Sequence, residues 1–217
     1  MVLESEVLKN EHKALLFDFD KTLVNANSIE VLANSLGFTP KLADARKEYY
    51  AKQITERVLT RRIAAMLKET RLDEFNRVAS QTPKQLGVHA TLDALRLRGY
   101  KLGVVSFAFR QTIDAALGKE TFHELICPVL QVENGVLTGK VQIPRFLSAD
   151  LHVFCKGAAA KALMRHFNAK PAETIAVGDS RSDRPLLMEV AVPVEIHDNE
   201  KILPHSIKIK RLLDIAR

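Results

Sequence analysis

The stretch H-K-A-L-L-F-D-F-D-K-T-L, residues 12–23, decides the fold of this 217-residue chain. An uncharged run, Ala14 to Phe17, leads into Asp18 and Asp20. Such a run is typical of a strand buried on both faces of a parallel sheet. Because unpaired carboxylates are very costly in a core, we expect both aspartates at the carboxyl edge of the sheet, where open α/β sheets bind ligands. A strand end followed by an ordinary polar turn is the alternative.

Short apolar strands and helical segments alternate along the rest of the chain, which predicts a parallel α/β sheet. Strands are expected to end at Ser106 and at Gly178, and β-like stretches over 126–132 and 137–143 flank a hairpin signal at Asn134-Gly135. The segment 40–80 is helical, basic and without a strand pattern. We therefore predict an α/β core over 1–26 and 89–217, with a helical cap over 27–88.

Composition is that of a soluble globular protein, with 47% hydrophobic and 27% charged residues. The net charge of +6 favours an anionic partner. Lys and Arg are scattered and no aromatic residues are interleaved for base stacking, so a small anionic substrate is expected rather than nucleic acid.

No apolar run has the length of a membrane span, and the N-terminal residues are too acidic for a signal peptide. Cys127 and Cys155 match no zinc spacing and are expected to be free thiols in a reducing compartment. These features predict a cytoplasmic protein without a membrane partner, either a monomer or a homodimer.

Four polar signals follow predicted strands or open the next helix. They are Asp18 with Asp20, Ser106, Lys156, and Asp179 with Asp183. Each has an ordinary interpretation taken alone, as a helix cap, a solvated lysine or a turn. Because the sheet gathers its strand ends at one edge, the four together predict a single site.

The order D-F-D-K-T, V-S, K-G and G-D-S-R-S-D resembles the haloacid dehalogenase superfamily of aspartate-nucleophile phosphatases, and within it the phosphoserine-phosphatase-like branch, subfamily IB. The likeness covers nearly the whole chain, including the segment between the first two motifs and the E-N-G-V-L-T-G hairpin. It implies a Rossmann-like three-layer parallel sheet with an inserted small α-helical cap. It also implies a Mg²⁺-dependent phosphomonoester hydrolase that acts on a small phosphorylated metabolite through an aspartyl-phosphate.

The resemblance assigns roles to the first two acids and their neighbours. Asp18 matches the nucleophile and Asp20 the general acid that later activates water. Thr22 would bond to Asp20 or to the transferring phosphoryl group. The resemblance gives Mg²⁺ three ligands, namely Asp18, the backbone carbonyl of Asp20, and Asp179, which suits a cation that prefers oxygen.

The later motifs supply the remaining polar groups that the resemblance implies. Ser106 and Lys156 would hold phosphoryl oxygens and offset transition-state charge. Asp183 would orient either the waters of the metal or Lys156.

Several positions depart from the family pattern and bear on substrate binding. Phe107 and Ala108 stand where the branch has two glycines, which predicts a narrower and more apolar site. Ser182 replaces a common asparagine. Asn27 replaces the cap glutamate that would bind the amino group of phosphoserine.

The substrate-gripping arginine of the cap falls near Thr60 to Arg62, and we expect it to be Arg57, Arg61 or Arg62. Three functions stay open at this point. They are a phosphatase acting on another small metabolite, a phosphoserine phosphatase proper, and a non-catalytic relative that binds a phosphorylated ligand.

Overall fold

A six-stranded parallel sheet forms the centre of the molecule in the computed structural model, which describes residues 12–144, 155–196 and 201–215. The strand order is β3-β2-β1-β6-β7-β8, so β1 lies between β2 and β6. This arrangement confirms the predicted Rossmann-like α/β fold. The strand bounds are β1 Ala14–Phe17, β2 Lys101–Val105, β3 Glu124–Ile126, β6 Thr174–Gly178, β7 Val192–Ile196 and β8 Ile207–Ile209.

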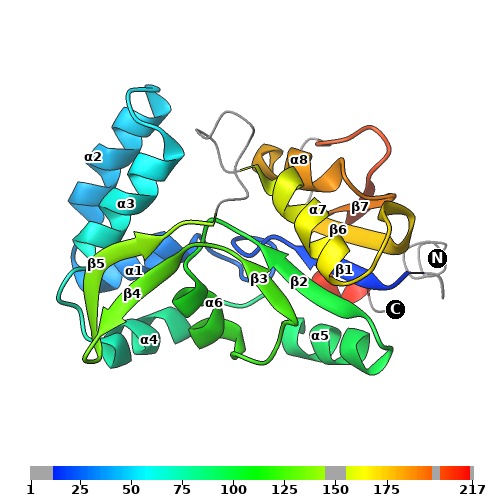
Figure 1. Cartoon of the computed structure of the whole chain (residues 1–217), viewed down its shortest axis with the longest axis horizontal. Helices are drawn as coiled ribbons and strands as arrows, with labels where there is room; N and C mark the ends of the chain where they lie inside the picture. The colour runs from blue at the N-terminus through cyan, green and yellow to red at the C-terminus, as the bar shows by residue number, and fades with distance from the viewer. Residues whose placement is uncertain (1–11, 145–154, 197–200, 216–217) are drawn as a thin grey trace.

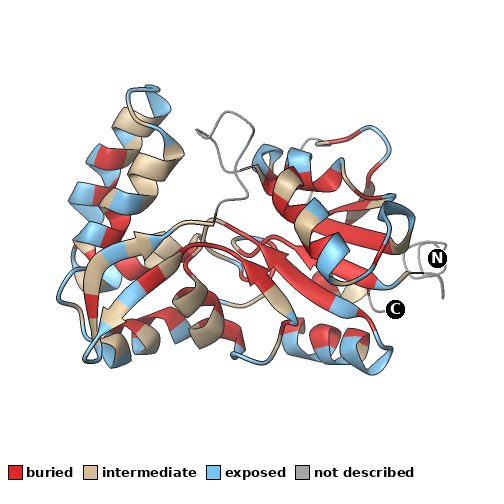
Figure 2. Ribbon diagram, viewed as in Figure 1, coloured by how far each residue is buried: buried red, intermediate tan, exposed pale blue. Residues whose placement is uncertain are grey.

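Helices cover both faces of this sheet, which gives three layers (Figure 1). One face packs against α5 and α6, and the other against α7 and α8. Buried residues concentrate in the strands and in the helix faces turned toward them (Figure 2). The helix bounds are α5 Val88–Leu97, α6 Arg110–Leu117, α7 Lys156–His166 and α8 Arg184–Leu187.

Strand β1 shows why its sequence had to be uncharged. Leu15 and Phe17 join the hydrophobic cluster that contains α5, whereas Leu16 joins the cluster that contains α7. Successive side chains of a strand point to opposite faces, and here both faces are covered. All four residues of β1 are fully buried, so the first polar position available is Asp18.

Four helices follow β1 before the chain returns to the sheet, as the sequence predicted for its basic segment. They are α1 Ser28–Leu36, α2 Thr39–Tyr50, α3 Glu56–Met66 and α4 Leu72–Ser80. We refer to α1–α4 as the helical insertion. Its hydrophobic cluster also includes Phe109 from the loop after β2 and Leu130 and Leu137 from the hairpin strands β4 Val129–Glu133 and β5 Val136–Gln142. The hairpin therefore packs with the helical insertion (Figure 1).

The hairpin turn has the geometry that its sequence indicated. Asn134 and Gly135 have φ angles of 50° and 76°, the left-handed values that a two-residue turn of this kind requires. The expectation of one β-like stretch over 126–132 was wrong. The core strand β3 ends at Ile126 and β4 begins at Val129, because Pro128 between them has no N–H to continue a ladder.

Within the described residues, no helix is both long enough and apolar enough to span a membrane.

Leu95 and Leu97, two residues apart on α5, provide a matched test of the core. Leu95 is fully buried and Leu97 is 89% exposed. Leu95→Ala should lower the free energy of unfolding by about 2 to 5 kcal/mol, because the cavity it leaves cannot collapse fully. Leu97→Ala should change it by less than about 0.5 kcal/mol. Urea unfolding of both variants measures the difference, and equal losses would contradict this packing.

Candidate active site

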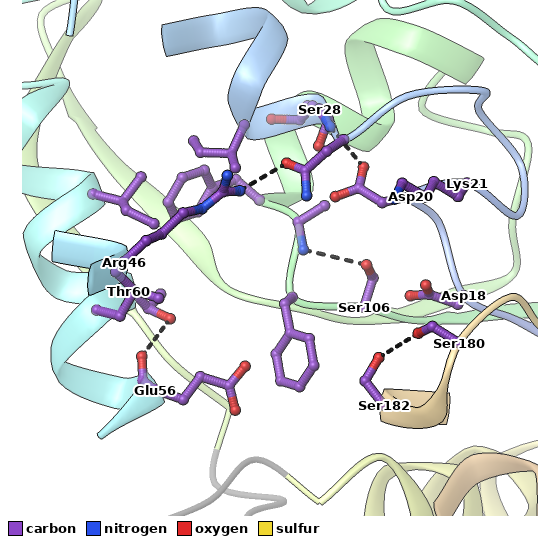
Figure 3. Close-up of a pocket in the computed structure, with 18 of the residues that line it drawn as sticks. Asp18, Asp20, Lys21, Ser28, Arg46, Glu56, Thr60, Ser106, Ser180 and Ser182 are labelled. Carbon is purple, nitrogen blue, oxygen red and sulfur yellow. Dashed lines mark hydrogen bonds between the residues drawn. The ribbon is translucent and has the colours of Figure 1, made fainter. Parts of the chain in front are cut away.

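The polar residues predicted from the strand ends meet at one edge of the sheet. Asp18 follows β1, Ser106 follows β2 and Asp179 follows β6. Since β1 pairs with both β2 and β6, these three residues emerge side by side. A cavity of about 370 Å³ lies over this edge and is closed on the other side by residues of α1, α2 and α3 (Figure 3).

Most of the residues predicted for the site line this cavity. They are Asp18, Asp20, Asn27, Ser106, Phe107, Lys156, Asp179 and Ser182. Three groups of predicted residues do not line it, namely Asp183, Thr22 and the three arginines of α3.

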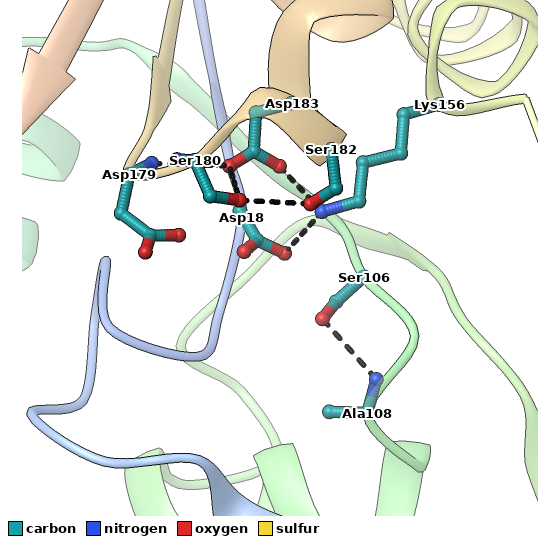
Figure 4. A network of polar contacts seen from close by, with 8 residues as sticks. All are labelled: Asp18, Ser106, Ala108, Lys156, Asp179, Ser180, Ser182 and Asp183. Atoms are coloured by element: carbon teal, nitrogen blue, oxygen red, sulfur yellow. Dashed lines mark hydrogen bonds and ion pairs between the residues drawn. The ribbon is translucent and has the colours of Figure 1, made fainter. Parts of the chain in front are cut away.

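Lys156 is the buried cation of the site (Figure 4). Its Nζ lies 2.7 Å from Oδ1 of Asp18 and 2.5 Å from Oδ1 of Asp183. Burial alone would lower the pKa of Lys156, but the charges of Asp18 and Asp183 raise it overall. The amine is therefore protonated, and two of its three N–H donors are directed at these carboxylates.

Asp183 lies behind the cavity and organises the loop after β6. Its Oδ2 accepts the N–H groups of Asp179 and Ser180, both at 3.0 Å, and the hydroxyl of Ser180 at 3.2 Å. Gly178 permits this close approach, because a Cβ there would lie 2.5 Å from Cβ of Asp183. Asp183 is thus a positioning residue for Lys156 and Asp179.

Three buried carboxylates suit a divalent cation at this edge. Oxygen atoms of Asp18, Asp179 and Asp183 lie within 4.8 Å of one another. Both oxygens of Asp183 already accept hydrogen bonds, so Asp18 and Asp179 are the carboxylates best placed to bind a metal. The ligand atoms offered here are carboxylate oxygens, which are the ligands that a hard cation such as Mg²⁺ prefers.

The raised pKa of Asp18 is a second indication that a cation binds beside this carboxyl group. Burial and the nearby charges of Asp183 and Asp20 raise the pKa of Asp18 and Lys156 lowers it, and the net result is a pKa of about 7. At neutral pH Lys156 alone leaves this carboxyl group partly protonated. A cation bound beside it would favour the carboxylate, the form that acts as a nucleophile.

Asp20 is held at the start of the helical insertion. A tight turn follows it, in which the carbonyl of Phe19 accepts the N–H groups of Thr22, Leu23 and Val24. Oδ1 of Asp20 then accepts the N–H of Ser28, the first residue of α1, at 3.0 Å. Burial raises the pKa of Asp20 and the N–H of Ser28 lowers it, with a net rise that suits a proton donor.

Thr22, for which the resemblance predicts a bond to Asp20 or to the transferring phosphoryl group, is not among the residues that line the cavity. The turn directs its side chain inward, where it is fully buried. Its Oγ1 has no hydrogen-bond partner among the described residues, so a bond to Asp20 is absent there.

The loop after β2 combines one polar group with an aromatic wall. Oγ of Ser106 lies in the cavity and accepts the N–H of Ala108 at 3.2 Å. The ring of Phe107 lies 5.0 Å from Nζ of Lys156, within the range of a cation–π contact. Phe107, Ala108 and Phe109 of this loop add an apolar stretch to the cavity wall beside the polar residues of the core.

The three arginines predicted to grip the substrate do not line the cavity. The residues of α3 that do are Glu56, Leu59, Thr60 and Ile63, which share one helix face at intervals of three and four. Arg57, Arg61 and Arg62 fall on the other faces. Arg62 is ion-paired with Glu48 of α2 at 2.8 Å.

Arg46 of α2 lines the cavity instead, and the sequence analysis missed it. It donates to Oδ1 of Asn27 at 3.2 Å and pairs with Glu30 at 2.5 Å. A signal was available in the sequence. Arg46 and Tyr50 follow the buried Leu42 at intervals of four, so the inward face of α2 continues into the cavity.

Asp183→Asn tests the buried ion pairs without removing a large side chain. Breaking a buried pair leaves a charge poorly compensated, so the free energy of unfolding should fall by about 3 to 5 kcal/mol. Glu189→Gln is the matched control. It breaks a pair with Lys161, whose side chain is 60% exposed and whose Nζ lies 3.1 Å from the carboxylate, and should cost under about 1 kcal/mol. Urea unfolding measures both losses, and equal losses in the free energy of unfolding would contradict the structural role of Asp183.

Several known proteins are similar to this chain in sequence or in structure. The phosphoserine phosphatase of Methanocaldococcus jannaschii is 24% identical over 86% of both chains. That of Idiomarina loihiensis is 26% identical over 96% of this chain and 94% of its own. The solved structure of a phospho-aspartyl intermediate analogue of phosphoserine phosphatase covers 85% of this chain and 86% of its own, with 25% identity and a TM-score of 0.66.

The model of one family, the haloacid dehalogenase-like hydrolases, matches residues 15–188. The match includes β1 with its two aspartates, the helical insertion, Ser106, Lys156 and the loop that holds Asp179 and Asp183. It therefore spans most of the core together with every part of the site. This chain belongs to the haloacid dehalogenase-like hydrolase family.

Proposed function

We propose that this protein is a Mg²⁺-dependent phosphomonoester hydrolase that acts on a small phosphorylated metabolite through an aspartyl-phosphate on Asp18. The observation that carries the proposal is the contact of Lys156 with Asp18 at the floor of the cavity, beside Asp179 and Ser106. A carboxylate, an ammonium group and a hydroxyl that converge in this way suit in-line attack on a phosphoryl group.

Asp18 attacks phosphorus and forms a bond to it, while the bond to the leaving oxygen breaks. Asp20 donates its proton to that oxygen, and its raised pKa keeps the proton available. In the second step Asp20 takes a proton from water, which attacks the phosphorus and releases both phosphate and Asp18. When bound, Mg²⁺ supplies positive charge that offsets the negative charge of the phosphoryl oxygens.

Two further residues hold the phosphoryl group during both steps. Lys156 has a third N–H donor beyond those directed at Asp18 and Asp183, and it can bind a phosphoryl oxygen. The hydroxyl of Ser106 can bind another. The helical insertion serves as a cap in this proposal, since its residues form one wall of the cavity and limit the access of water to the intermediate.

Phosphoserine phosphatase is the second candidate, because the similar proteins carry that name. The neutral side chain of Asn27 weighs against it, since a carboxylate at this position would pair with the amino group of phosphoserine. The two free cysteines accord with work in a reducing compartment such as the cytoplasm.

Asp18→Asn tests the covalent mechanism. The amide has nearly the same shape but cannot act as an anionic nucleophile, so p-nitrophenyl phosphate hydrolysis with Mg²⁺ should fall about 1000-fold or more. The assay releases coloured p-nitrophenolate and is repeated for the unaltered protein with EDTA in place of Mg²⁺. Hydrolysis that survives either change would overturn the proposal, and a protein inactive under all conditions would favour the ligand-binding alternative.

Asp20→Asn tests the general acid. It should slow hydrolysis of an alkyl phosphate by about 100- to 10,000-fold, because the alkoxide leaving group needs a proton. The loss of kcat should be smaller for p-nitrophenyl phosphate, whose leaving group is already stable as an anion. Equal losses for both esters would mean that another residue protonates the leaving oxygen.

Asp179→Ala tests the metal site without an activity assay. Mg²⁺ at a hundred times its Kd should stabilise the native protein by about 2.7 kcal/mol, or roughly 5 to 10 °C in Tm. Asp179→Ala should largely remove this shift, whereas Asp93→Ala, at an exposed position of α5, should retain it. A shift that persists in the Asp179 variant would show that Mg²⁺ binds elsewhere.

A further inference from the structure

The part of the cavity beyond the phosphoryl-binding edge has several apolar side chains in its walls. Ile29 and Leu32 of α1 and Leu59 and Ile63 of α3 line it on the side of the helical insertion. Phe107 lines it on the side of the core. A leaving group that fills this space gains from burying a carbon skeleton, by about 0.8 kcal/mol for each methylene group.

Polar side chains lie among these apolar ones, and Arg46 is a basic one that the helical insertion supplies. Arg46 spends two of its five N–H donors on Glu30 and Asn27, so among the described residues its guanidinium keeps donors for a ligand. Its side chain is only 21% exposed, whereas that of Glu30 is 54% exposed. An exposed carboxylate gains little from such a pair and can be displaced by an anion that enters the cavity.

Arg46 also lies close to the position of the leaving oxygen. It donates to Asn27, and the next residue, Ser28, donates its N–H to the carboxylate of Asp20 (Figure 3). Asp20 is the group that protonates the leaving oxygen in the proposed function. The guanidinium and the general acid are therefore tied to neighbouring residues at the start of α1, which favours a short spacer between the two groups that they bind.

We propose that the leaving group is an acidic alcohol, in which a short aliphatic skeleton joins the leaving oxygen to an anionic group that Arg46 binds in place of Glu30. The inference rests on the proposed function and specifies the substrate class of the same site. It assigns specificity to Arg46 and gives Glu30 the role of an internal competitor for the anion.

A matched set of phosphate esters separates the possible end groups. All share a straight alkyl chain of two to six carbons, and the far end carries a methyl group, a carboxylate, a second phosphate or an ammonium group. The carboxylate and phosphate arms distinguish the two anions that an arginine fork binds well. The ammonium arm tests the competing chemistry, because Glu56 of α3 also lines the cavity.

The unaltered protein should prefer a short carboxylate- or phosphate-terminated ester over the methyl-terminated ester of equal length. Arg46→Gln should lower kcat/KM for that anionic ester about 10- to 100-fold more than for p-nitrophenyl phosphate, since a charged hydrogen-bond partner is lost. Arg46→Lys keeps the positive charge, so it should lower kcat/KM for the anionic ester less than Arg46→Gln does. Glu30→Gln should act in the opposite direction and lower KM for the anionic ester several-fold.

Arg62→Gln and Glu48→Gln are the matched controls. These residues form the same kind of ion pair between helices of the insertion, but neither lines the cavity. Both control variants should leave the ranking of the esters unchanged. The opposite signs expected for Arg46→Gln and Glu30→Gln also separate lost recognition from impaired folding, which would lower all rates together.

Three results would overturn the inference. One is a preference for methyl-terminated esters, another is equal loss for all esters in Arg46→Gln, and the third is a preference for ammonium-terminated esters that Glu56→Gln removes. In each case p-nitrophenyl phosphate is still hydrolysed and the proposed function stands. Failure to hydrolyse any ester, p-nitrophenyl phosphate included, would overturn the proposed function and this inference with it.

Discussion

The ammonium group of Lys156 lies between the carboxylates of Asp18 and Asp183, at 2.7 Å and 2.5 Å, and the site depends on this buried contact. Two carboxylates and one ammonium group can be buried away from water here only because each of them lies beside a group of opposite charge. The contact ties the end of β1 to the start of α7 and to the loop after β6. It therefore fixes the nucleophile before any substrate is present, so less of the binding energy is needed to orient it.

Asp183 also positions the loop that carries Asp179, on the metal-binding side of the site. Its second oxygen holds the N–H groups of Asp179 and Ser180, so one carboxylate sets both the lysine and the loop. The arrangement leaves Asp18 and Asp179 with the concentrated negative charge that a divalent cation would relieve. The helical insertion then adds a second, more exposed ion pair, Arg46 with Glu30, at the leaving-group end of the cavity. The buried contact is suited to chemistry, and the exposed one to recognition of a charged ligand.

The sequence was most informative where a chemically useful residue directly follows a strand. The uncharged run 14–17 followed by two aspartates predicted both the central strand and the acids at its end, because few other structures satisfy that pattern. The interval of four from Leu42 to Arg46 was a usable signal, but it does not by itself single out Arg46 among the basic residues of 40–80, since the face that a helix presents depends on its packing partners. The burial of Thr22 could not be read from the pattern either, because Thr22 lies in a turn in which the carbonyl of Phe19 accepts three N–H groups. The sequence also could not predict that the hairpin packs against the helical insertion, because the two segments are about 60 residues apart in the chain.

The central claim is that Asp18 carries the phosphoryl group, and direct trapping is the measurement that tests it. The Asp20→Asn variant slows release of the intermediate, so brief reaction with p-nitrophenyl phosphate and Mg²⁺ followed by acid quenching should capture it. Mass spectrometry of the quenched protein and of its peptides should find one phosphoryl group per chain, on the peptide that contains Asp18. A phosphoryl group on another residue such as Ser106, or steady turnover with no labelled peptide at any time, would contradict the account.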